Sequence, residues 1–155
     1  MASGKKSVLF ICLGNICRSP IAEAVFAHMV KEKGLQDKWH IDSAGTADYH
    51  IGSKPDKRGL KCLKSHNIET PHRCRQITPN DFTDFDVIFG MDHSNMEDLK
   101  DLAPKCATAK LEMLGEYDPK KQLIIEDPYY GEDSDFETVF QQCWRCCEAF
   151  LKQNS

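Results

Sequence analysis

The segment of residues 7–20 constrains the fold more than any other part of the chain. It begins with a continuous apolar run, SVLFIC over Ser7–Cys12, which is typical of a strand covered on both faces. The short stretch LGNIC follows, and Arg18 stands six residues after Cys12. Pro20 suits the first turn of a helix, where no N–H partner is required. The segment therefore predicts a strand, a tight loop and a helix N-terminus, with a cysteine where the strand ends.

Strand-like and helix-like segments alternate along the rest of the chain. Apolar runs are separated by stretches with apolar residues at helical spacing. The expected strands are 7–12, 39–44, 85–91 and 109–114, with 74–77 as a further candidate, and the expected helices are 21–34, 56–66, 92–104 and 134–152. In the last helix, Ser134 and Glu137 have the spacing of a capping box. The alternation predicts an α/β fold with a mostly parallel sheet, whose ligands bind beyond the carboxyl ends of the strands.

Length, charge and cysteine content limit the class of protein. A chain of 155 residues forms one domain, which we expect over residues 7–155 after a flexible tail at residues 1–6. The net charge of −4 disfavours nucleic-acid binding. We expect no signal peptide in the polar N-terminus and no membrane span, since no apolar stretch reaches roughly 18 residues. Eight cysteines without a secretion signal favour free thiols and a cytoplasmic location.

The loop after Cys12 combines an anion site with a nucleophile. An isolated cysteine has a pKa of about 8.5, and both a helix N-terminus and the permanent cation of Arg18 favour a thiolate. The backbone N–H groups of residues 13–19 can form a nest for an anion of phosphate size. Gly14 and Asn15 tolerate the positive φ that a tight loop requires. The loop therefore offers a nucleophile, an anion cradle and a guanidinium clamp.

Other uses of this loop fit less well. The sequence has no Gly-Lys-[Ser/Thr] and no G-x-G-x-x-G pattern, and the spacing of Cys12 and Cys17 is not the Cys-x-x-Cys of a redox motif. A protective disulfide between these two cysteines stays open, as does a phosphate-binding module without catalysis. A Cys-x5-Arg pattern alone is a weak signal. Its place between a strand and a helix makes the catalytic interpretation the stronger one.

The sequence resembles the low-molecular-weight protein tyrosine phosphatase family along essentially the whole chain. The resemblance rests on VLFICLGNICRSPIAEA at residues 8–24 and DPYYG at residues 127–131, with further blocks at 42–44, 75–78, 91–92 and 117–119. It implies a single-domain, three-layer α/β/α sandwich with a central, mostly parallel four-stranded sheet and a phosphate-binding loop after the first strand. It also implies hydrolysis of phosphotyrosine and small aryl phosphate monoesters, with acid phosphatase activity.

The resemblance assigns the chemistry to three residues. Cys12 would form a cysteinyl-phosphate, Arg18 would hold the phosphoryl oxygens, and Asp127 would act as general acid and then as general base. No metal or cofactor is implied. The expected partners are phosphotyrosine proteins or peptides, with inorganic phosphate as product inhibitor and the chain mostly a monomer capable of weak self-association. The expected phosphate-binding and supporting residues are Leu13, Gly14, Asn15, Ile16, Cys17 and Ser19.

Further polar residues resemble the family's network that holds the loop in shape. Ser19 would donate a hydrogen bond to the nucleophile sulfur. The other expected members are Asn15, Ser43, His72 and Asp92, with His66 as a further candidate. Each has a plain alternative, because such residues commonly cap loops, strands and helices or lie on the surface.

Aromatic residues are expected to form the walls of the substrate pocket. Tyr129 and Tyr130 can stack on a substrate ring, and Tyr49 with Leu13 can form the opposite wall. The adjacent tyrosines also resemble the family's phosphorylation sites. The residues around Tyr49 follow no motif that carries over, so the substrate preference within the class stays open.

The remaining cysteines suggest two alternatives, and the sequence disfavours both. A thiol-relay reductase on the same fold would need reactive cysteines near the loop, and residues 78–93 contain none. Cys143, Cys146 and Cys147 could suggest zinc, but the first and last lie on the apolar stripe of a predicted helix, where buried free thiols are common. The histidines show no paired ligand spacing. We therefore expect no metal site.

Overall fold

The computed structural model describes residues 5–154, so residues 1–4 of the expected tail and residue 155 lie outside the description. One sheet has the strand order β2-β1-β3-β4, and every pairing in it is parallel. Its strands are β1 (Lys6–Cys12), β2 (Trp39–Gly45), β3 (Val87–Gly90) and β4 (Lys110–Met113). The chain proceeds from β1 to β2 on one side and then to β3 and β4 on the other. The strand order therefore reverses between β1 and β3, and ligands bind at the carboxyl ends beside such a reversal.

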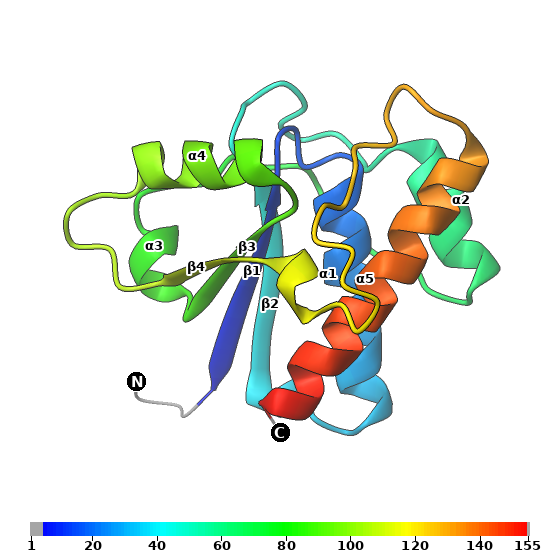
Figure 1. Cartoon of the computed structure of the whole chain (residues 1–155), viewed down its shortest axis with the longest axis horizontal. Helices are drawn as coiled ribbons and strands as arrows, with labels where there is room; N and C mark the ends of the chain where they lie inside the picture. Colours follow the sequence, from blue (N-terminus) through cyan, green and yellow to red (C-terminus); the bar gives the residue numbers. More distant parts are fainter. Residues whose placement is uncertain (1–4, 155) are drawn as a thin grey trace.

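Helices cover both faces of this sheet (Figure 1). On one face lie α1 (Arg18–Glu32), α2 (Lys57–Ser65) and α5 (Asp133–Gln153), and on the other lie α3 (Asp81–Asp84) and α4 (His93–Leu102). Successive side chains of β1 alternate between the two faces: Val8 and Phe10 belong to the core under α1 and α5, whereas Leu9 and Ile11 belong to the core under α3 and α4. The predicted single-domain, three-layer α/β/α fold is confirmed.

The two long helices, α1 and α5, pack against each other through apolar side chains. The ring centroids of Phe26 and Phe150 lie 5.6 Å apart. Cys143, Cys146 and Cys147 are fully buried in the same cluster. Burial raises the pKa of the Cys146 thiol to about 12 and raises the pKa of the other two well above their usual value. These thiols are core residues of α5.

No helix in residues 5–154, not even the 21-residue α5, is long and apolar enough to cross a membrane.

The expected strand at residues 74–77 is wrong. Only Gln76 pairs with the sheet, through one parallel bridge to Gly45 at the end of β2. The backbone of Cys74 is already used: its N–H donates to the Ser53 carbonyl at 2.9 Å, and its carbonyl accepts from the Gly52 N–H at 2.8 Å. This segment therefore braces the loop that follows β2 instead of extending the sheet.

The N-terminus of α5 also differs from the expectation. The helix begins at Asp133 after an N-cap at Glu132, and the capping box joins Glu132 to Asp135 instead of Ser134 to Glu137. The Asp135 carboxylate accepts the Glu132 N–H at 2.8 Å. Carboxylates in this turn also face the positive end of the helix dipole. Glu137 instead reaches across to the end of α2.

Candidate active site

The loop between β1 and α1 turns its carbonyl groups outward. Three of these carbonyls accept hydrogen bonds from surrounding segments at 2.8–2.9 Å: Leu13 from the Ala47 N–H, Asn15 from the Cys74 thiol, and Ile16 from the Asp56 N–H. In a trans peptide, the N–H of the next residue points the opposite way from the carbonyl. The N–H groups of residues 14, 16 and 17 therefore point to the concave side of the loop. This concavity is suited to an anion with several oxygens.

Two backbone positions set the shape of the loop. Asn15 has φ 56° in the left-handed region, whereas Gly14, for which we expected similar freedom, has no positive φ. Gly45 lies so close to the loop that a Cβ there would be 2.7 Å from the Leu13 carbonyl oxygen and 3.0 Å from the Asn15 nitrogen. Only glycine fits this close approach. The sequence alone did not single out Gly45, and its local signal is a glycine that ends the second strand.

Cys12 ends β1 and is 3% exposed. Its Sγ lies 3.0 Å from Ser19 Oγ. The same Ser19 Oγ accepts a hydrogen bond from Asn15 Nδ2 at 2.8 Å. The Ser19 hydroxyl proton is therefore available to the sulfur, where a donor stabilises negative charge.

A buried set of polar side chains fixes the amide of Asn15. Its Oδ1 accepts the Arg75 backbone N–H at 3.0 Å and lies 2.7 Å from His72 Nε2. Its Nδ2 donates to Ser43 Oγ at 3.0 Å as well as to Ser19. Because a backbone N–H can only donate, the Arg75 contact determines which atom of the amide is oxygen. Ser43 and His72 therefore contact Asn15 and not the cysteine.

Glu23 on α1 completes this network, and the sequence did not single it out. Its Oε1 lies 3.1 Å from His72 Nδ1 and accepts the Ser43 hydroxyl at 2.5 Å. Burial, with Asp42 nearby, raises the pKa of Glu23 to about 7, and burial lowers the pKa of His72. Both shifts favour the neutral form of each group. In either state His72 Nε2 donates to the Asn15 carbonyl oxygen, which can only accept.

Arg18 begins α1, and its side chain is only 4% exposed. Its Nη1 donates to Asp92 Oδ2 at 2.6 Å and to the Ile125 carbonyl at 2.9 Å. Asp92 follows β3 as the N-cap of α4. The two strands at the reversal of the sheet therefore supply the cysteine and the carboxylate that orients the guanidinium. The Arg18 Nη2 atom lies 4.0 Å from Asp127 Oδ2.

The loop opens into a cavity of about 340 Å³. The residues predicted to carry the chemistry and those predicted to wall the pocket meet here: Cys12, Arg18, Asp127, Tyr49, Tyr129 and Tyr130. Leu13 also lines it, as does His50, which the sequence did not single out. Tyr130 is 95% exposed and Tyr49 is 69% exposed, so these rings lie at the rim. The cavity has a charged floor and an aromatic mouth.

A cation on α2 holds the segment that follows Asp127. Arg58 donates to the carbonyls of Tyr129 and Gly131 at 2.8 and 3.0 Å, and its guanidinium pairs with Asp56 at 3.0 Å. The Asp127 side chain is 44% exposed, and its Oδ1 accepts the Tyr129 N–H at 3.1 Å. Arg58 was not predicted, since its partners lie more than 70 residues away in the sequence.

Two further predictions have different outcomes. Cys17 lines the cavity together with Cys12 as a free thiol, and burial and Asp56 raise the pKa of Cys17 well above its usual range. A disulfide between the two stays a prediction.

The assignment of His66 to the Asn15 network is wrong, because its Nε2 contacts Glu137 on α5 at 3.0 Å.

A thiol, an anion nest and a carboxylic acid that meet at the strand reversal of a four-stranded parallel sheet define a cysteine-dependent phosphatase. The family model described as low molecular weight phosphotyrosine protein phosphatase matches residues 7–154. The chain belongs to this family. It is therefore a phosphoric monoester hydrolase that acts on phosphotyrosine.

Similar proteins cover nearly the whole chain. The low molecular weight phosphotyrosine protein phosphatase of Rattus norvegicus is 60% identical over 152 residues, which cover 97% of this chain and 96% of the rat protein. The Homo sapiens protein of the same name is 60% identical over 96% of this chain and 95% of its own. Among solved structures, Primo-1 has a TM-score of 0.91 at 47% identity, covering 96% of this chain and 97% of its own. The protein tyrosine phosphatase from Entamoeba histolytica, with Hepes in its active site, has a TM-score of 0.92 at 36% identity, covering 97% of each chain.

Proposed function

We propose that Cys12 is the nucleophile and Asp127 the general acid and base of this phosphatase. Cys12 attacks the phosphorus, the bond from phosphorus to the tyrosine oxygen breaks, and Asp127 gives its proton to that oxygen. In the second step Asp127 takes a proton from water, the water oxygen bonds to phosphorus, and Cys12 leaves as a thiolate. The observation that carries this assignment is the meeting of Cys12, Arg18 and Asp127 in one cavity.

The phosphoryl oxygens are held by Arg18 and by the inward N–H groups of residues 14, 16 and 17. Support comes from the outward carbonyls of the loop and from the two anchors of the guanidinium, Asp92 and the Ile125 carbonyl. Donors that are fixed before the substrate binds need no reorganisation when charge develops on the oxygens. Inorganic phosphate has the same oxygens and no leaving group. It therefore acts as a product inhibitor in the same cradle.

The aromatic mouth selects for an aryl ester. The rings of Tyr49 and Tyr129 and the side chain of Leu13 provide apolar surface on which a phenyl ring can stack. Small aryl phosphates and phosphotyrosine in peptides both offer such a ring, which supports acid phosphatase activity as well. A serine phosphate is shorter and has no ring. We expect it to be a poor substrate.

Two properties outside the site complete the proposal. The described cysteines are free thiols, which is typical of a reducing compartment and supports a cytoplasmic location. We expect the chain to be mostly monomeric, with weak self-association through the exposed rim that contains Tyr130. Sedimentation velocity over a range of protein concentrations tests this expectation.

The test is hydrolysis of a phosphotyrosine peptide in the presence of chelator, with matched phosphoserine and phosphoarginine peptides. The last comparison matters because a structural relative, the Drosophila arginine phosphatase DARP, is 42% identical with a TM-score of 0.90 and covers 96% of this chain and 97% of its own. We expect the tyrosine peptide to be preferred and Cys12→Ser to abolish its turnover. Activity retained by Cys12→Ser would disprove the assignment of the nucleophile.

A further inference from the structure

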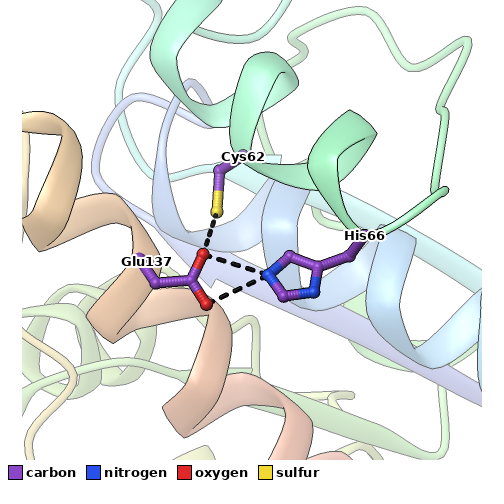
Figure 2. A group of neighbouring side chains, drawn as sticks. All are labelled: Cys62, His66 and Glu137. Carbon is purple, nitrogen blue, oxygen red and sulfur yellow. Dashed lines mark hydrogen bonds and ion pairs between the residues drawn. The ribbon is translucent and has the colours of Figure 1, made fainter.

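A second cluster of reactive side chains lies between α2 and α5, outside the cavity just described (Figure 2). Cys62 and His66 lie one turn apart at the end of α2, and Glu137 extends toward both from α5. Histidine, cysteine, aspartate and glutamate side chains can each offer one ligand atom to a metal ion. Within residues 5–154, this cluster is one of two groups of at least three such side chains whose ligand atoms all lie within 4.8 Å of one another. The other, Glu23, Asp42 and His72, belongs to the network around Asn15.

We propose that Cys62, His66 and Glu137 form a binding site for a zinc ion. A thiolate, an imidazole and a carboxylate are the three ligand types that zinc accepts, and three protein ligands leave a fourth position for water. A thiolate in the set disfavours Mg²⁺ and Ca²⁺, which prefer oxygen ligands. The site lies outside the catalytic cavity, and none of its three residues lines that cavity.

The distances from Glu137 to the other two ligand atoms are close to those of a tetrahedral site. Zinc bonds of about 2.0 Å to nitrogen and oxygen and about 2.3 Å to sulfur place ligands about 3.3–3.5 Å apart. His66 Nε2 lies 3.0 Å from each Glu137 oxygen, and Cys62 Sγ lies 3.4 Å from Oε1. The third pair, Cys62 Sγ and His66 Nε2, lies within 4.8 Å. Small movements of these side chains bring the three atoms around the ion.

Neighbouring side chains hold two of the three ligands in place. The His66 ring stacks on Phe140, with centroids 3.8 Å apart and planes within 10° of parallel. Gln141 Nε2 donates to Glu137 Oε2 at 2.7 Å. Such outer contacts fix the orientation of metal ligands and strengthen binding. A metal ion can reach the cluster from solvent, because the side chains of His66 and Glu137 are 32% and 43% exposed. Cys62 lies at the buried end of the cluster.

Binding replaces a proton by the ion. In the metal-free chain the Cys62 thiol donates to the Glu137 carboxylate, and zinc takes the place of that proton, which is released to solvent. The thiolate and the carboxylate together then carry two negative charges that balance Zn²⁺. The ion would join α2, which carries Arg58, to α5, which begins just after the segment that Arg58 holds.

The test is a calorimetric titration of Zn²⁺ into the full chain carrying Cys12→Ser, which removes the active-site thiolate as a competing ligand. Co²⁺ serves as a second probe, because a bound thiolate gives it a charge-transfer absorption band. We expect one zinc per chain and a cobalt–thiolate band. Zinc at about 100 times its Kd should raise the Tm by roughly 5–10 °C.

Variants of the ligands decide where the ion binds. Cys62→Ser should remove the cobalt band, and Cys62→Ser, His66→Gln and Glu137→Gln should each weaken zinc binding by more than about 100-fold, whereas Gln141→Leu should weaken it about 10-fold. Matched changes at exposed positions, Cys106→Ser and Glu148→Gln, should leave it unchanged. Glu137→Gln changes a partly exposed group, so it keeps the test valid if Cys62→Ser unfolds the chain.

Three results would overturn the site. These are no binding by the Cys12→Ser chain at zinc concentrations well above that of the protein, unchanged affinity in Glu137→Gln, and loss of binding in His72→Gln with retention in His66→Gln. The last result would place the ion at the Glu23, Asp42 and His72 group.

Discussion

The side-chain amide of Asn15 donates to the hydroxyl oxygen of Ser19, at 2.8 Å, and thereby leaves the Ser19 proton for the sulfur of Cys12. The direction of each hydrogen bond in this series is thus set by the neighbouring bond that lies farther from Cys12. Arg75 fixes the amide of Asn15, the amide fixes the hydroxyl of Ser19, and the hydroxyl faces Cys12. A series of hydrogen bonds of this kind predicts that Asn15 and Ser19 act on the cysteine together.

The first prediction concerns this coupling. We expect Ser19→Ala and Asn15→Gly, which keeps the positive φ of residue 15, each to lower kcat by about 10–100-fold, because a hydrogen bond to a charged group contributes about 1.5–3 kcal/mol. The loss should fall on the second step, in which Cys12 departs as a thiolate. Burst-phase kinetics with an aryl phosphate separate the two steps. In the double variant we expect a loss no larger than that of the worse single variant, and multiplied losses would show that Asn15 does not act through Ser19.

The second prediction concerns Asp127 as the proposed donor of a proton to the leaving group. Asp127→Asn should lower kcat/KM, which reports the first step alone, by about 100- to 10,000-fold for esters of poorly departing phenols, because their oxygen must be protonated as it leaves. For phenols that depart easily the loss should be much smaller. The measurement is a series of aryl phosphates with leaving groups of increasing acidity. Equal losses along the series would rule out Asp127 as the acid.

The third prediction concerns Arg58, which touches the backbone of the acid segment and not the cavity floor. Arg58→Lys keeps the charge but loses the forked contact with the carbonyls of Tyr129 and Gly131. We expect a several-fold fall in kcat/KM for poor leaving groups and a smaller fall for good ones. The exposed Lys64 on the same helix offers a matched control, and Lys64→Ala should have no effect. A similar fall for all leaving groups would argue against a role in placing the acid.

The fourth prediction follows from the raised pKa of Glu23. Burial raises this pKa from 4.5 to about 7, so between these values the folded chain binds more protons than the unfolded chain. The free energy of unfolding therefore falls as the pH rises from 4.5 to 7, by roughly 3 kcal/mol for this group. Glu23→Gln removes this dependence. Urea unfolding at several pH values should show a flatter profile for Glu23→Gln than for the exposed control Glu32→Gln, and identical slopes would contradict the prediction.

Local patterns predicted the parts of the fold that depend on neighbouring residues. The run at residues 7–12 predicts a buried strand because almost every one of its side chains is apolar, and in β1 all but Lys6 are buried. The segment at 74–77 has only two apolar residues, Cys74 and Ile77, and it is not a strand because its backbone groups bond to the loop after β2. The composition of a segment does not determine which hydrogen-bond partners its backbone N–H and carbonyl groups have in the folded chain.

The site was predictable where one short segment carries it. Cys12, Asn15, Arg18 and Ser19 lie within one loop and one helical turn, so their proximity follows from their spacing. Asp127 came from the family resemblance, since a turn aspartate before a proline is otherwise unremarkable. The ligand atoms of Cys62, His66 and Glu137 meet only because α2 packs on α5. A cysteine and a histidine four residues apart on a helix were the available signal.

The contacts of Ile125 bear on how the enzyme turns over. Its N–H donates to the Met91 carbonyl beyond β3 at 3.0 Å, and its carbonyl accepts from Arg18 at 2.9 Å. Ile125 is fully buried, and it stands two residues before Asp127. The segment with Asp127 is therefore fastened on one side by the guanidinium of Arg18, and on the other side by Arg58. With both of its flanks bonded to the rest of the fold, we expect this segment to hold the same position before and after a substrate arrives, so that the transfer of a proton needs no closure of a lid.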